Sequence, residues 1–576
     1  MLQKSINNTD SPWLAQFERK FVTKNLVVKN FDDIKSYFVE LENRKIHSEE
    51  DLIKFLHDYS EVLAISLETR TAAYIDMTRF VNDNNKKEAY IRIVKDLEPN
   101  LAKWENILNK KYINSEFRIS LKSRPEYQRL DKIFETSLQL FNKKNIDINV
   151  RLKELAQQYE MIFGSMTINF DNSEKTIREL ALYLKNNDQK VRKSAYLAIF
   201  ERRISEKDKL EDIFDEMVQL RNQLADNLSL DNFVDYSFQS KLRDYSYQDC
   251  LNFHNSIEKK VLPIAKNIFA KRKKLMNLDR IAIWDIDNDP RGGEPLKPFN
   301  TADELFNAAL NIFGKVDSEL MAKFRSLESF LDLESRKGKA QGGYQATYDE
   351  MRVPFIFTNA IGLQDDLNTL LHEAGHAFHT LECRDNPLIW YRHSSIEFAE
   401  VASMSMELIG YQFLDSVYSD SRSVKRILQE KFESIVTLLL WIARVDAFQC
   451  WLYTNKNHNR ETRYQYWVEL ANRFNPGIDY SLAPEDALGY AWHGQLHIFT
   501  VPLYYIEYAI AMLGALQLFN NYLVDPNLAI KSYKNSLKLG GQEFNRKLFE
   551  SASIKFDFSE QLLGDLLEKS AKELYY

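Results

Sequence analysis

Residues 366–382 read DLNTLLHEAGHAFHTLE, and the interpretation of the whole chain starts from this stretch. Its apolar positions recur at spacings of three and four, which predicts a helix: Leu367, Leu370, Leu371, Ala374, Ala377 and Phe378. Within it, His372, Glu373 and His376 form an H-E-x-x-H motif. Residues four apart share a helix face, so both imidazoles can bind one metal ion. Glu373 is rotated by about 100° from His372, so it points beside the ion and can act as a base for water.

A catalytic zinc site needs a third protein ligand and keeps its fourth position open. The metzincin pattern would place glycine at position 379 and histidine at position 382, but the chain has His379 and Glu382. For His379 we expect a structural role or a role behind the ligands. The next acidic residues lie in SSIEFAEVASMSMEL, residues 394–408, a second predicted helix with Glu397, Glu400 and Glu407. By periodicity alone Glu397 and Glu400 are nearly equal candidates for the third ligand, and the other acid can orient a histidine.

Two other metal sites are disfavoured by the sequence. Glu373 and His376 also match half of the E-x-x-H pattern of di-iron bundles, but no other glutamate lies three residues before a histidine. His493 and His497 are four residues apart without an intervening glutamate, so we do not expect an independent metal site there. Tyr505 and Tyr508, further along this segment, share a helix face, and a tyrosine hydroxyl can donate to a developing oxyanion. Packing in an aromatic core explains the two tyrosines equally well.

The rest of the chain predicts an all-α protein. It has 17 glycines and 13 prolines in 576 residues, far fewer than sandwiches, barrels or Rossmann folds require. Long amphipathic helices are expected over residues 31–70, 88–115 and 130–162. Residues 166–180 predict a short strand followed by a helix that begins at Asn172 and Ser173. Residues 278–301 are predicted to be non-helical. Residues 335–359 are predicted to be a second irregular region, in which the part 347–359 can form one or two short strands.

Charge and cysteine content limit the possible partners. The chain has 76 basic and 83 acidic residues, a net charge of −7, so we expect neither nucleic acid nor an anionic membrane as a partner. Three widely spaced cysteines and an N-terminus without an apolar signal core predict a cytoplasmic protein. Residues 498–519 are long and apolar enough to resemble a membrane-spanning helix. Glu507 and three tyrosines predict instead a buried helix that starts after Pro502.

Several segments resemble the thimet oligopeptidase and oligoendopeptidase F family of zinc metallopeptidases, which are gluzincins. TLLHEAGHAFH is similar to the family's signature helix, and EVASMSME (400–407) to its third-ligand motif. HIFTVPLYYIEY (497–508) resembles the C-terminal substrate-binding motif and is closest to the oligoendopeptidase F branch. GKAQGGY (338–344) with PFIFTN (354–359) resembles the loop and edge strand over the family's cleft. The resemblance covers roughly residues 190–576.

The resemblance implies roles for individual residues. It implies one zinc ion per chain, bound by His372, His376 and Glu400, with Glu373 as general base. It assigns transition-state stabilisation to Tyr508 with His497, and Tyr505 is the alternative donor because a VPL stretch replaces the position where thimet oligopeptidase has a tyrosine. The remaining residues that it assigns contact substrate or lie behind the ligands: Gly342, Gly343, Tyr344 and Phe357 for substrate, Glu407 and His379 behind the ligands.

The resemblance also implies a fold and an activity. The fold is all-α, a two-lobed, clam-like shell around a deep channel, with a small β element next to the active-site helix. Residues 1–190 would form a helical wall or lid, and residues 191–576 the catalytic domain. The activity is that of a zinc endopeptidase that cleaves short, unstructured peptides. The alternatives are a related exopeptidase of the dipeptidyl- or carboxypeptidase type and a non-catalytic peptide-binding protein. A monomer and a dimer are both compatible with the sequence.

Overall fold

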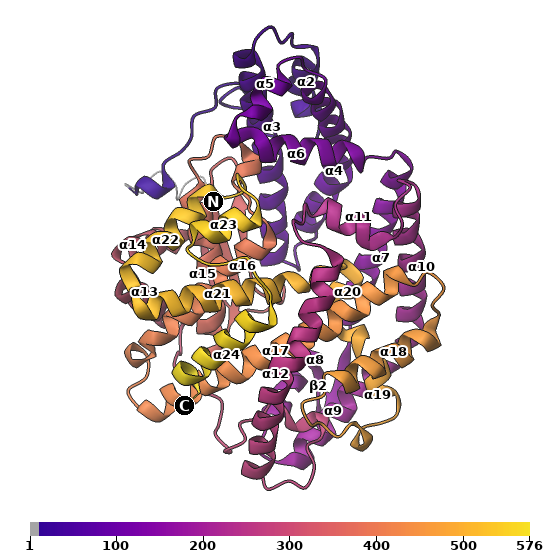
Figure 1. Cartoon of the computed structure of the whole chain (residues 1–576), viewed down its shortest axis with the longest axis vertical. Coiled ribbons are helices and arrows are strands. Elements are labelled where there is room, and N and C mark those ends of the chain that lie inside the picture. The colour runs from indigo at the N-terminus through magenta and orange to yellow at the C-terminus, as the bar shows by residue number, and fades with distance from the viewer. Residues whose placement is uncertain (1–10, 576) are drawn as a thin grey trace. The chain divides into compact units, whose positions relative to one another are not determined.

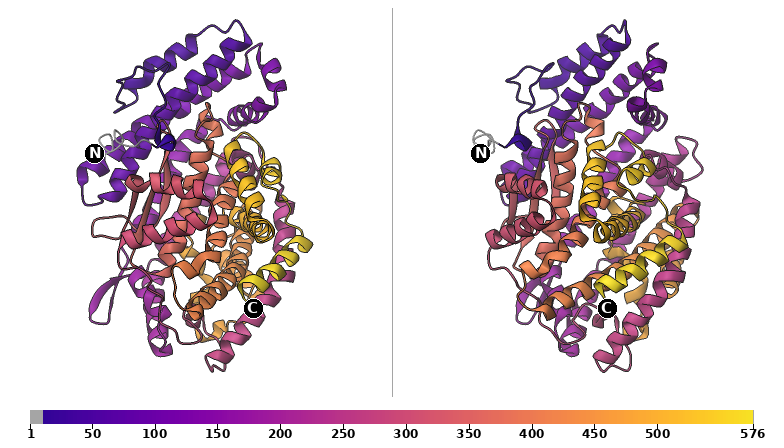
Figure 2. Two further views of the ribbon diagram at one scale, coloured as in Figure 1. Left: turned by 90° about the vertical axis from the view of Figure 1, so that its left-hand side faces the viewer. Right: turned by 60° about the vertical axis from the view of Figure 1, so that its left-hand side comes forward.

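The computed structural model describes residues 11–575 and is built almost entirely of helices (Figure 1). This confirms the prediction of an all-α protein. The few strands belong to one two-stranded and one three-stranded sheet among the described residues. Helices α2 (Asp32–Asn43), α3 (Glu49–Arg79) and α4 (Asn84–Ile113) run alongside one another, as the two views of Figure 2 show, and correspond to the long helices expected from periodicity.

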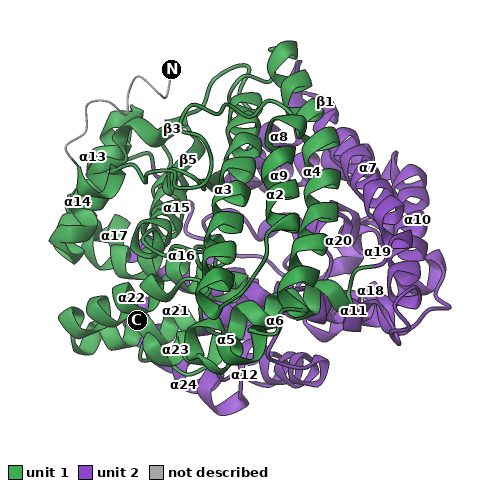
Figure 3. Ribbon diagram, turned by 90° about the horizontal axis from the view of Figure 1, so that it is seen from above, with its two compact units in different colours: residues 1–141, 297–424, 514–556 green, residues 142–296, 425–513, 557–576 purple. Residues whose placement is uncertain are grey.

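The chain divides into two compact units, and each unit combines separate stretches of sequence (Figure 3). Unit 1 contains the described residues up to Phe141, Lys297–Val424 and Gly514–Phe556. Unit 2 contains Asn142–Leu296, Lys425–Leu513 and the residues from Asp557 onward. The expected boundary near residue 190 lies inside unit 2, so it is not a point where the chain passes between units. A separate functional role for residues 1–190 stays a prediction.

Unit 1 contains the segment with the H-E-x-x-H motif. Its further elements are η2 (Pro12–Leu14), α5 (Arg118–Ser123), α6 (Pro125–Gln139), α13 (Ala302–Val316), α14 (Ser318–Ser326), η5 (Glu328–Phe330), β3 (Leu331–Glu334), β4 (Tyr344–Tyr348), β5 (Val353–Ala360), α15 (Gln364–Cys383), η6 (Ile389–Tyr391), α16 (Ile396–Gly410), η7 (Tyr411–Ser416), α22 (Pro526–Leu539) and α23 (Asn545–Ser551). Its N-terminal helices enclose an apolar core in which Phe38, Phe55 and Phe134 are buried together with Ile389 of η6.

The three-stranded sheet lies directly against α15. Strand β5 is central, with β3 parallel to it on one side and β4 antiparallel on the other. Helix α15 packs on β5 and also against α16, so the motif helix lies between the sheet and the second acidic helix. The prediction of a short strand within residues 347–359 is confirmed by β5, whereas β4 begins earlier, at Tyr344, and reaches into this range only at Thr347 and Tyr348. Strand β3 was not predicted from the sequence.

Unit 2 is also helical. Its elements are α7 (Lys144–Gly164), β1 (Thr167–Phe170), β2 (Ser173–Thr176), α8 (Ile177–Ala181), η3 (Leu182–Lys185), α9 (Gln189–Ile204), α10 (Lys207–Asp226), α11 (Phe233–Ser240), α12 (Tyr247–Leu275), η4 (Ile283–Asp285), α18 (Arg460–Arg473), η8 (Tyr480–Leu482), α19 (Asp486–Gly489), η9 (Ala491–Gly494), α20 (Leu496–Thr500) and α24 (Glu560–Leu574). Residues 278–301 contain only the short η4 among their regular elements, as predicted. Helices α17 (Ser421–Thr454) and α21 (Ile506–Val524) each continue from one unit into the other.

The prediction of a helix starting at Asn172 and Ser173 is wrong. Residues 173–176 form β2, which pairs antiparallel with β1. Asp171 and Asn172, with φ of 53° and 59°, make the two-residue turn between them, because these residue types tolerate the left-handed region that such turns require. The helix α8 begins only after Thr176, which forms a capping box with Glu179.

Two apolar segments are core helices. One helix, α17, is long and apolar enough to cross a membrane, but 78% of its most apolar window is buried within the protein. The apolar segment 498–519 is interrupted after α20, and a new helix, α21, begins at Ile506, beyond Pro502 as predicted. Along α21, Ala509, Leu513 and Leu516 are buried, which agrees with a core helix.

Candidate metal centre

A glycine allows α15 and α16 to approach closely. A Cβ atom on Gly375 would lie 2.5 Å from the Cα atom of Ser403 and 2.6 Å from the carbonyl oxygen of Ala402, distances that real Cβ atoms do not reach. Only a residue without a side chain fits at this crossing. Gly375 lies between the two motif histidines, so the helices are closest where those histidines face α16. A glycine inside a helical pattern is the sequence signal for such close packing.

The crossing brings His372, His376 and Glu400 together. One ligand atom from each of the three side chains lies within 4.8 Å of the other two. Glu400 Oε2 is 3.4 Å from His372 Nε2 and 3.7 Å from His376 Nε2. Two atoms that bind one zinc ion tetrahedrally at about 2.0–2.1 Å are about 3.4 Å apart, so this donor group has the size and chemistry of a three-ligand zinc site.

Neighbouring groups orient each of the three donors. Glu407 Oε1 lies 2.6 Å from His372 Nδ1, and the carbonyl oxygen of Ala399 accepts a hydrogen bond from the His376 ring. Ser403 Oγ donates to Glu400 Oε2 at 2.9 Å. Such contacts fix the histidine rings so that their other nitrogen faces the ion. The i, i+3 spacing of Glu400 and Ser403 is the signal that places both side chains on one face of α16.

Glu373 lies beside the donor group rather than within it. It is buried, and the backbone N–H of Gln345 in β4 donates a hydrogen bond to its carboxylate. This matches the geometry expected for the second residue of the motif. The contact with Gln345 could not be read from the sequence, because it depends on how β4 packs against α15.

The charges at this centre are strongly coupled. Burial and the nearby Glu400 raise the pKa of Glu373 to about 7, and burial also raises the pKa of Glu400. Although burial opposes it, the hydrogen bond with Glu407 and the surrounding carboxylates raise the pKa of His372 to about 9. Burial and the neighbouring His372 lower the pKa of His376 to about 3. A divalent cation held here would favour ionised carboxylates and neutral imidazoles.

The predicted substrate residues lie around β4. Gly343 lies near Glu373, since a Cβ there would be 3.9 Å from Glu373 Oε1. Gly342 has a φ of +105°, a backbone conformation that favours glycine, and the space where a side chain would lie is open. The Tyr344 ring stacks on Phe357 at 4.8 Å between centroids, and its hydroxyl is 2.6 Å from Thr78 Oγ1. The Phe357 ring is fully buried, so it supports Tyr344 and offers no surface of its own.

Three further polar residues on these helices are not part of the donor group. His379 is buried against the Phe398 ring, and its Nε2 atom has no hydrogen-bond partner among the described residues. Glu382, at the position where a metzincin would have a histidine, forms a buried ion pair with Lys323 of α14. Glu397 is buried on α16. The geometry therefore separates Glu400 from Glu397, which periodicity alone did not.

Unit 2 contains the cluster of His497, Tyr505 and Tyr508. The His497 ring lies 4.9 Å from the Tyr505 ring and 6.0 Å from the Tyr508 ring, measured between centroids. Gln495 Nε2 lies 2.8 Å from His497 Nδ1, and Trp441 Nε1 donates to Gln495 Oε1 at 2.9 Å. The Tyr505 hydroxyl is hydrogen-bonded to the same two side chains, Trp441 and Gln495. Neither of these two was predicted: Trp441 is far from the cluster in sequence, whereas Gln495 is only two residues before His497.

Comparisons with known proteins found a family model, several relatives and similar solved structures. The model of one family, described as peptidase family M3, matches residues 182–566. The oligoendopeptidase F homolog of Borreliella burgdorferi is 24% identical over 446 residues, which cover 72% of this chain and 71% of that protein. The group B oligopeptidase PepB of Streptococcus agalactiae is 24% identical over 486 residues, 78% of this chain and 76% of that protein. A structure of PZ peptidase A with an inhibitor has the same fold, with a TM-score of 0.88, 24% identity, and coverage of 96% of this chain and 99% of that chain.

We expect Gly375→Ala to weaken metal binding without changing any ligand. The added methyl group must push α16 away from α15, which separates Glu400 from the two histidines; overpacking of this kind also costs about 1–3 kcal/mol of stability. Zinc affinity measured by competition with a chelator should fall at least tenfold. Gly564→Ala in α24 is the matched control, since a Cβ there meets only the flexible side chain of Lys260 at 3.5 Å. Unchanged zinc affinity in Gly375→Ala would contradict the role assigned to this crossing.

Proposed function

Since this chain belongs to peptidase family M3 and is a metalloendopeptidase of the oligopeptidase kind, we propose that it cleaves short, unstructured peptides with one zinc ion bound by His372, His376 and Glu400. The observation that supports this most directly is the donor group itself, three ligand atoms at zinc-site spacing with Glu373 beside them. The names of the relatives, oligoendopeptidase F homolog and oligopeptidase PepB, support peptides as the substrate class.

Glu373 is the proposed general base. Zinc at the donor group would supply Lewis-acid chemistry, lowering the pKa of water and polarising a carbonyl group. The Glu373 carboxylate would take the proton of the attacking water and then pass it to the nitrogen of the leaving amine. The hydrogen bond from Gln345 holds the carboxylate in place for both transfers. The peptide bond breaks by direct attack of water, without a covalent enzyme intermediate.

Strand β4 is the proposed support for the substrate backbone. It is an edge strand, paired with β5 alone among the described residues, and the backbone N–H of its residue Gln345 points to Glu373. An extended peptide can add to such an edge through main-chain hydrogen bonds. Gly342 and Gly343 keep the approach to β4 free of side chains. Tyr344 contributes a ring that is held by stacking on the Phe357 ring.

Tyr508 is the proposed hydrogen-bond donor to the oxyanion that develops in the transition state. The family resemblance favours Tyr508 for this role, and the Tyr508 ring lies 6.0 Å from the His497 ring, measured between centroids. His497 would act with Tyr508, as the family resemblance implies. Tyr505 is the alternative donor, because Trp441 and Gln495 donate to its hydroxyl oxygen and leave its O–H able to donate.

A cytoplasmic location is part of this proposal and can be tested by cell fractionation. All three cysteines, Cys250, Cys383 and Cys450, are free and buried. Reducing compartments keep such thiols unpaired. The negative net charge gives no reason to expect nucleic acid or an anionic membrane as a partner.

Replacing Glu373 by Gln should strongly slow cleavage and leave zinc bound. The amide keeps the shape of the carboxylate but cannot take a proton, so we expect kcat to fall by roughly 10²–10⁴-fold. The substrate is a quenched peptide blocked at both ends, which an endopeptidase cleaves and an exopeptidase leaves intact. Zinc content by atomic absorption should stay near one ion per chain. Wild-type turnover by Glu373→Gln would rule out the proposed base.

Replacing Glu400 by Gln should cost the protein its zinc, whereas Glu397→Gln should not. The two glutamates are one turn apart on the same helix and both are buried, so they form a matched pair of variants. The carboxylate of Glu400 alone lies near the two imidazoles within the donor group. Zinc dissociation constants, measured with a fluorescent chelator, should rise at least a hundredfold in Glu400→Gln and stay within threefold in Glu397→Gln. The reverse order would make Glu397 the ligand.

Replacing Tyr508 by Phe should lower kcat with little effect on KM. Loss of one oxyanion donor costs roughly 10²–10³-fold in kcat. Tyr504→Phe is the control, since Tyr504 belongs to the same ring cluster and stacks on His497 at 5.6 Å between centroids. Steady-state kinetics should show a change of at most a few-fold for Tyr504→Phe. Equal effects of the two substitutions would indicate a packing role for the whole cluster.

A further inference from the structure

Unit 2 contains a cavity of about 340 Å³ that the proposed chemistry does not use. All residues that line it belong to unit 2. Aliphatic side chains form much of its wall, among them Ile199, Ile283 and Ile478, and the rings of Tyr196 and Tyr490 complete it. The volume lies at the small end of the range of roughly 300–1,000 Å³ that is usual for ligand pockets. Such walls suit an apolar group of the size of one amino-acid side chain.

A buried arginine without a carboxylate partner lines this cavity. Arg444 of α17 is only 7% exposed, its guanidinium lies over the Trp467 ring at 4.0 Å, and it is hydrogen-bonded to the Tyr480 hydroxyl. Its Nε and Nη2 atoms have no hydrogen-bond partner among the described residues. Leaving a buried charge without a counter-charge is costly, so an anion in this cavity would stabilise Arg444.

Other buried arginines of unit 2 have a carboxylate partner, which Arg444 lacks. Arg192 Nη2 donates to Asp285 at 2.6 Å, and Arg463 forms a buried ion pair with Glu211. In both cases a carboxylate of the chain itself neutralises the charge. The guanidinium of Arg444 is held in place by an aromatic ring and a hydroxyl, which orient it without neutralising it.

A second arginine lines the same cavity. Arg203 is exposed, and a Cβ on Gly494 would lie 3.4 Å from its Nη1 atom, so this nitrogen lies against the backbone of η9. Arg203 makes no ion pair with any other described residue. The acidic residue of the lining, Asp486, has Lys207 as a partner at 3.4 Å. The pocket therefore combines two cationic groups with apolar walls.

We propose that this pocket binds a carboxylate attached to an apolar group, with the carboxylate on Arg444 and Arg203 and the apolar group against the isoleucines. A guanidinium pairs with a carboxylate through charge-assisted hydrogen bonds, which are stronger than those between neutral groups. Two sources have this chemistry: a free apolar amino acid or small organic acid, and the C-terminal residue of a peptide. The second source rests on the proposed function, whereas the site itself does not.

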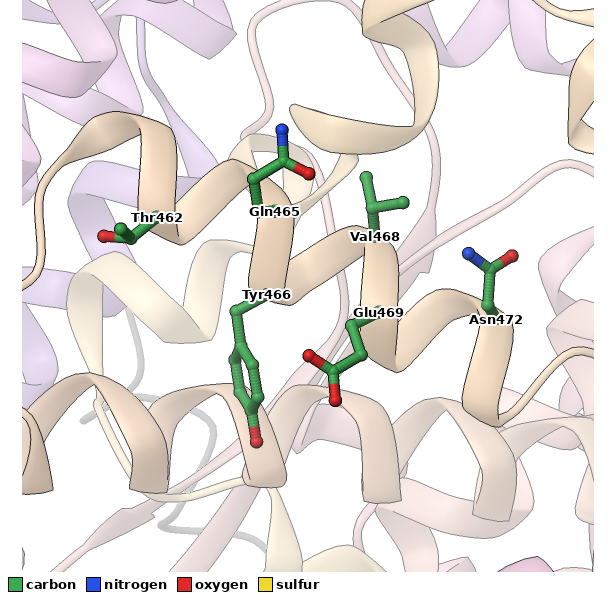
Figure 4. A pocket seen from close by; sticks show the side chains of 6 residues that line it. All are labelled: Thr462, Gln465, Tyr466, Val468, Glu469 and Asn472. Carbon is green, nitrogen blue, oxygen red and sulfur yellow. The ribbon is translucent and has the colours of Figure 1, made fainter.

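The pocket is linked to the His497 cluster. Trp441 lines the cavity and donates to Gln495, which in turn lies 2.8 Å from His497 Nδ1. A bound carboxylate would thus lie two side chains away from His497. Another hollow of unit 2, along α18, offers no such chemistry: Figure 4 shows that one helix supplies its lining, and the charged residue there is Glu469.

The first test measures binding without catalysis. N-acetyl-L-phenylalanine and its uncharged amide are titrated into the full-length protein by calorimetry, and again into the His376→Ala variant, in which the metal centre is disabled. We expect one site for the acid in both proteins and at least tenfold weaker binding of the amide. Equal binding of acid and amide, no binding of the acid, or loss of acid binding in His376→Ala would overturn the proposal.

Substitutions of the two arginines test whether the acid binds in this pocket. Arg444→Met and Arg203→Met should weaken binding of the acid roughly tenfold or more, the effect of removing a charge-assisted partner. Arg202→Met is the matched control, because Arg202 precedes Arg203 on α9 but pairs with Glu206 at 2.9 Å, and it should bind as the wild type does. If Arg444→Met does not fold, the exposed Arg203 still tests the site. Wild-type affinity in both variants would overturn it.

The second test separates the two sources. Matched peptides that end in phenylalanine, either as the free acid or as the amide, are compared by kcat/KM. If the peptide's own C-terminus occupies the pocket, the acid should be preferred at least tenfold by the wild type and not by Arg444→Met. If a free acid is the ligand, both proteins should cleave both peptides alike while the calorimetric result stands. An inactive enzyme would refute the proposed function and leave the calorimetric test of the pocket intact.

Discussion

The close approach of α15 and α16 at Gly375 is the constraint on which the candidate metal centre depends. A histidine pair on one helix defines only one side of a metal site, and the third ligand must come from another element at the right distance. Because Gly375 has no side chain, the backbone of α16 at Ala402 and Ser403 can contact α15 directly. Glu400, less than one turn earlier on α16, then reaches both imidazoles. One missing methyl group thus sets the spacing of three candidate ligands.

This packing also concentrates charge. Glu373, Glu400 and Glu407 are buried around two imidazoles, and the raised pKa of Glu373 and of His372 shows that the protein alone balances these charges poorly. A divalent cation held here would balance them, so the proposed binding of metal would also support the folding of this part of unit 1. Ser403, Ala399 and Gln345 supply hydrogen bonds that hold the charged groups in one arrangement.

The sequence was informative where the signal is local. Helices α15 and α16, the motif spacing and the start of α21 after Pro502 follow from periodicity and helix geometry, and the family was identified from short motifs. Periodicity could not decide between Glu397 and Glu400 as the candidate third ligand, because that choice depends on the point at which two helices cross. The turn at Asp171 and Asn172 was misinterpreted as a helix start because asparagine suits both. Strand β3 has only four residues and pairs in parallel with a strand more than 20 positions later, so it leaves no local signal in the sequence. The division into two units leaves none either, because each unit combines distant stretches of the chain.

The edge position of β4 has a consequence for selectivity. A surface that holds a peptide through main-chain groups treats all sequences alike, since every residue except proline presents the same N–H and C=O. An enzyme built this way is indifferent to composition along most of its substrate. The proposed role of β4 therefore predicts an enzyme that degrades a mixed pool of peptide fragments and spares proline-rich ones.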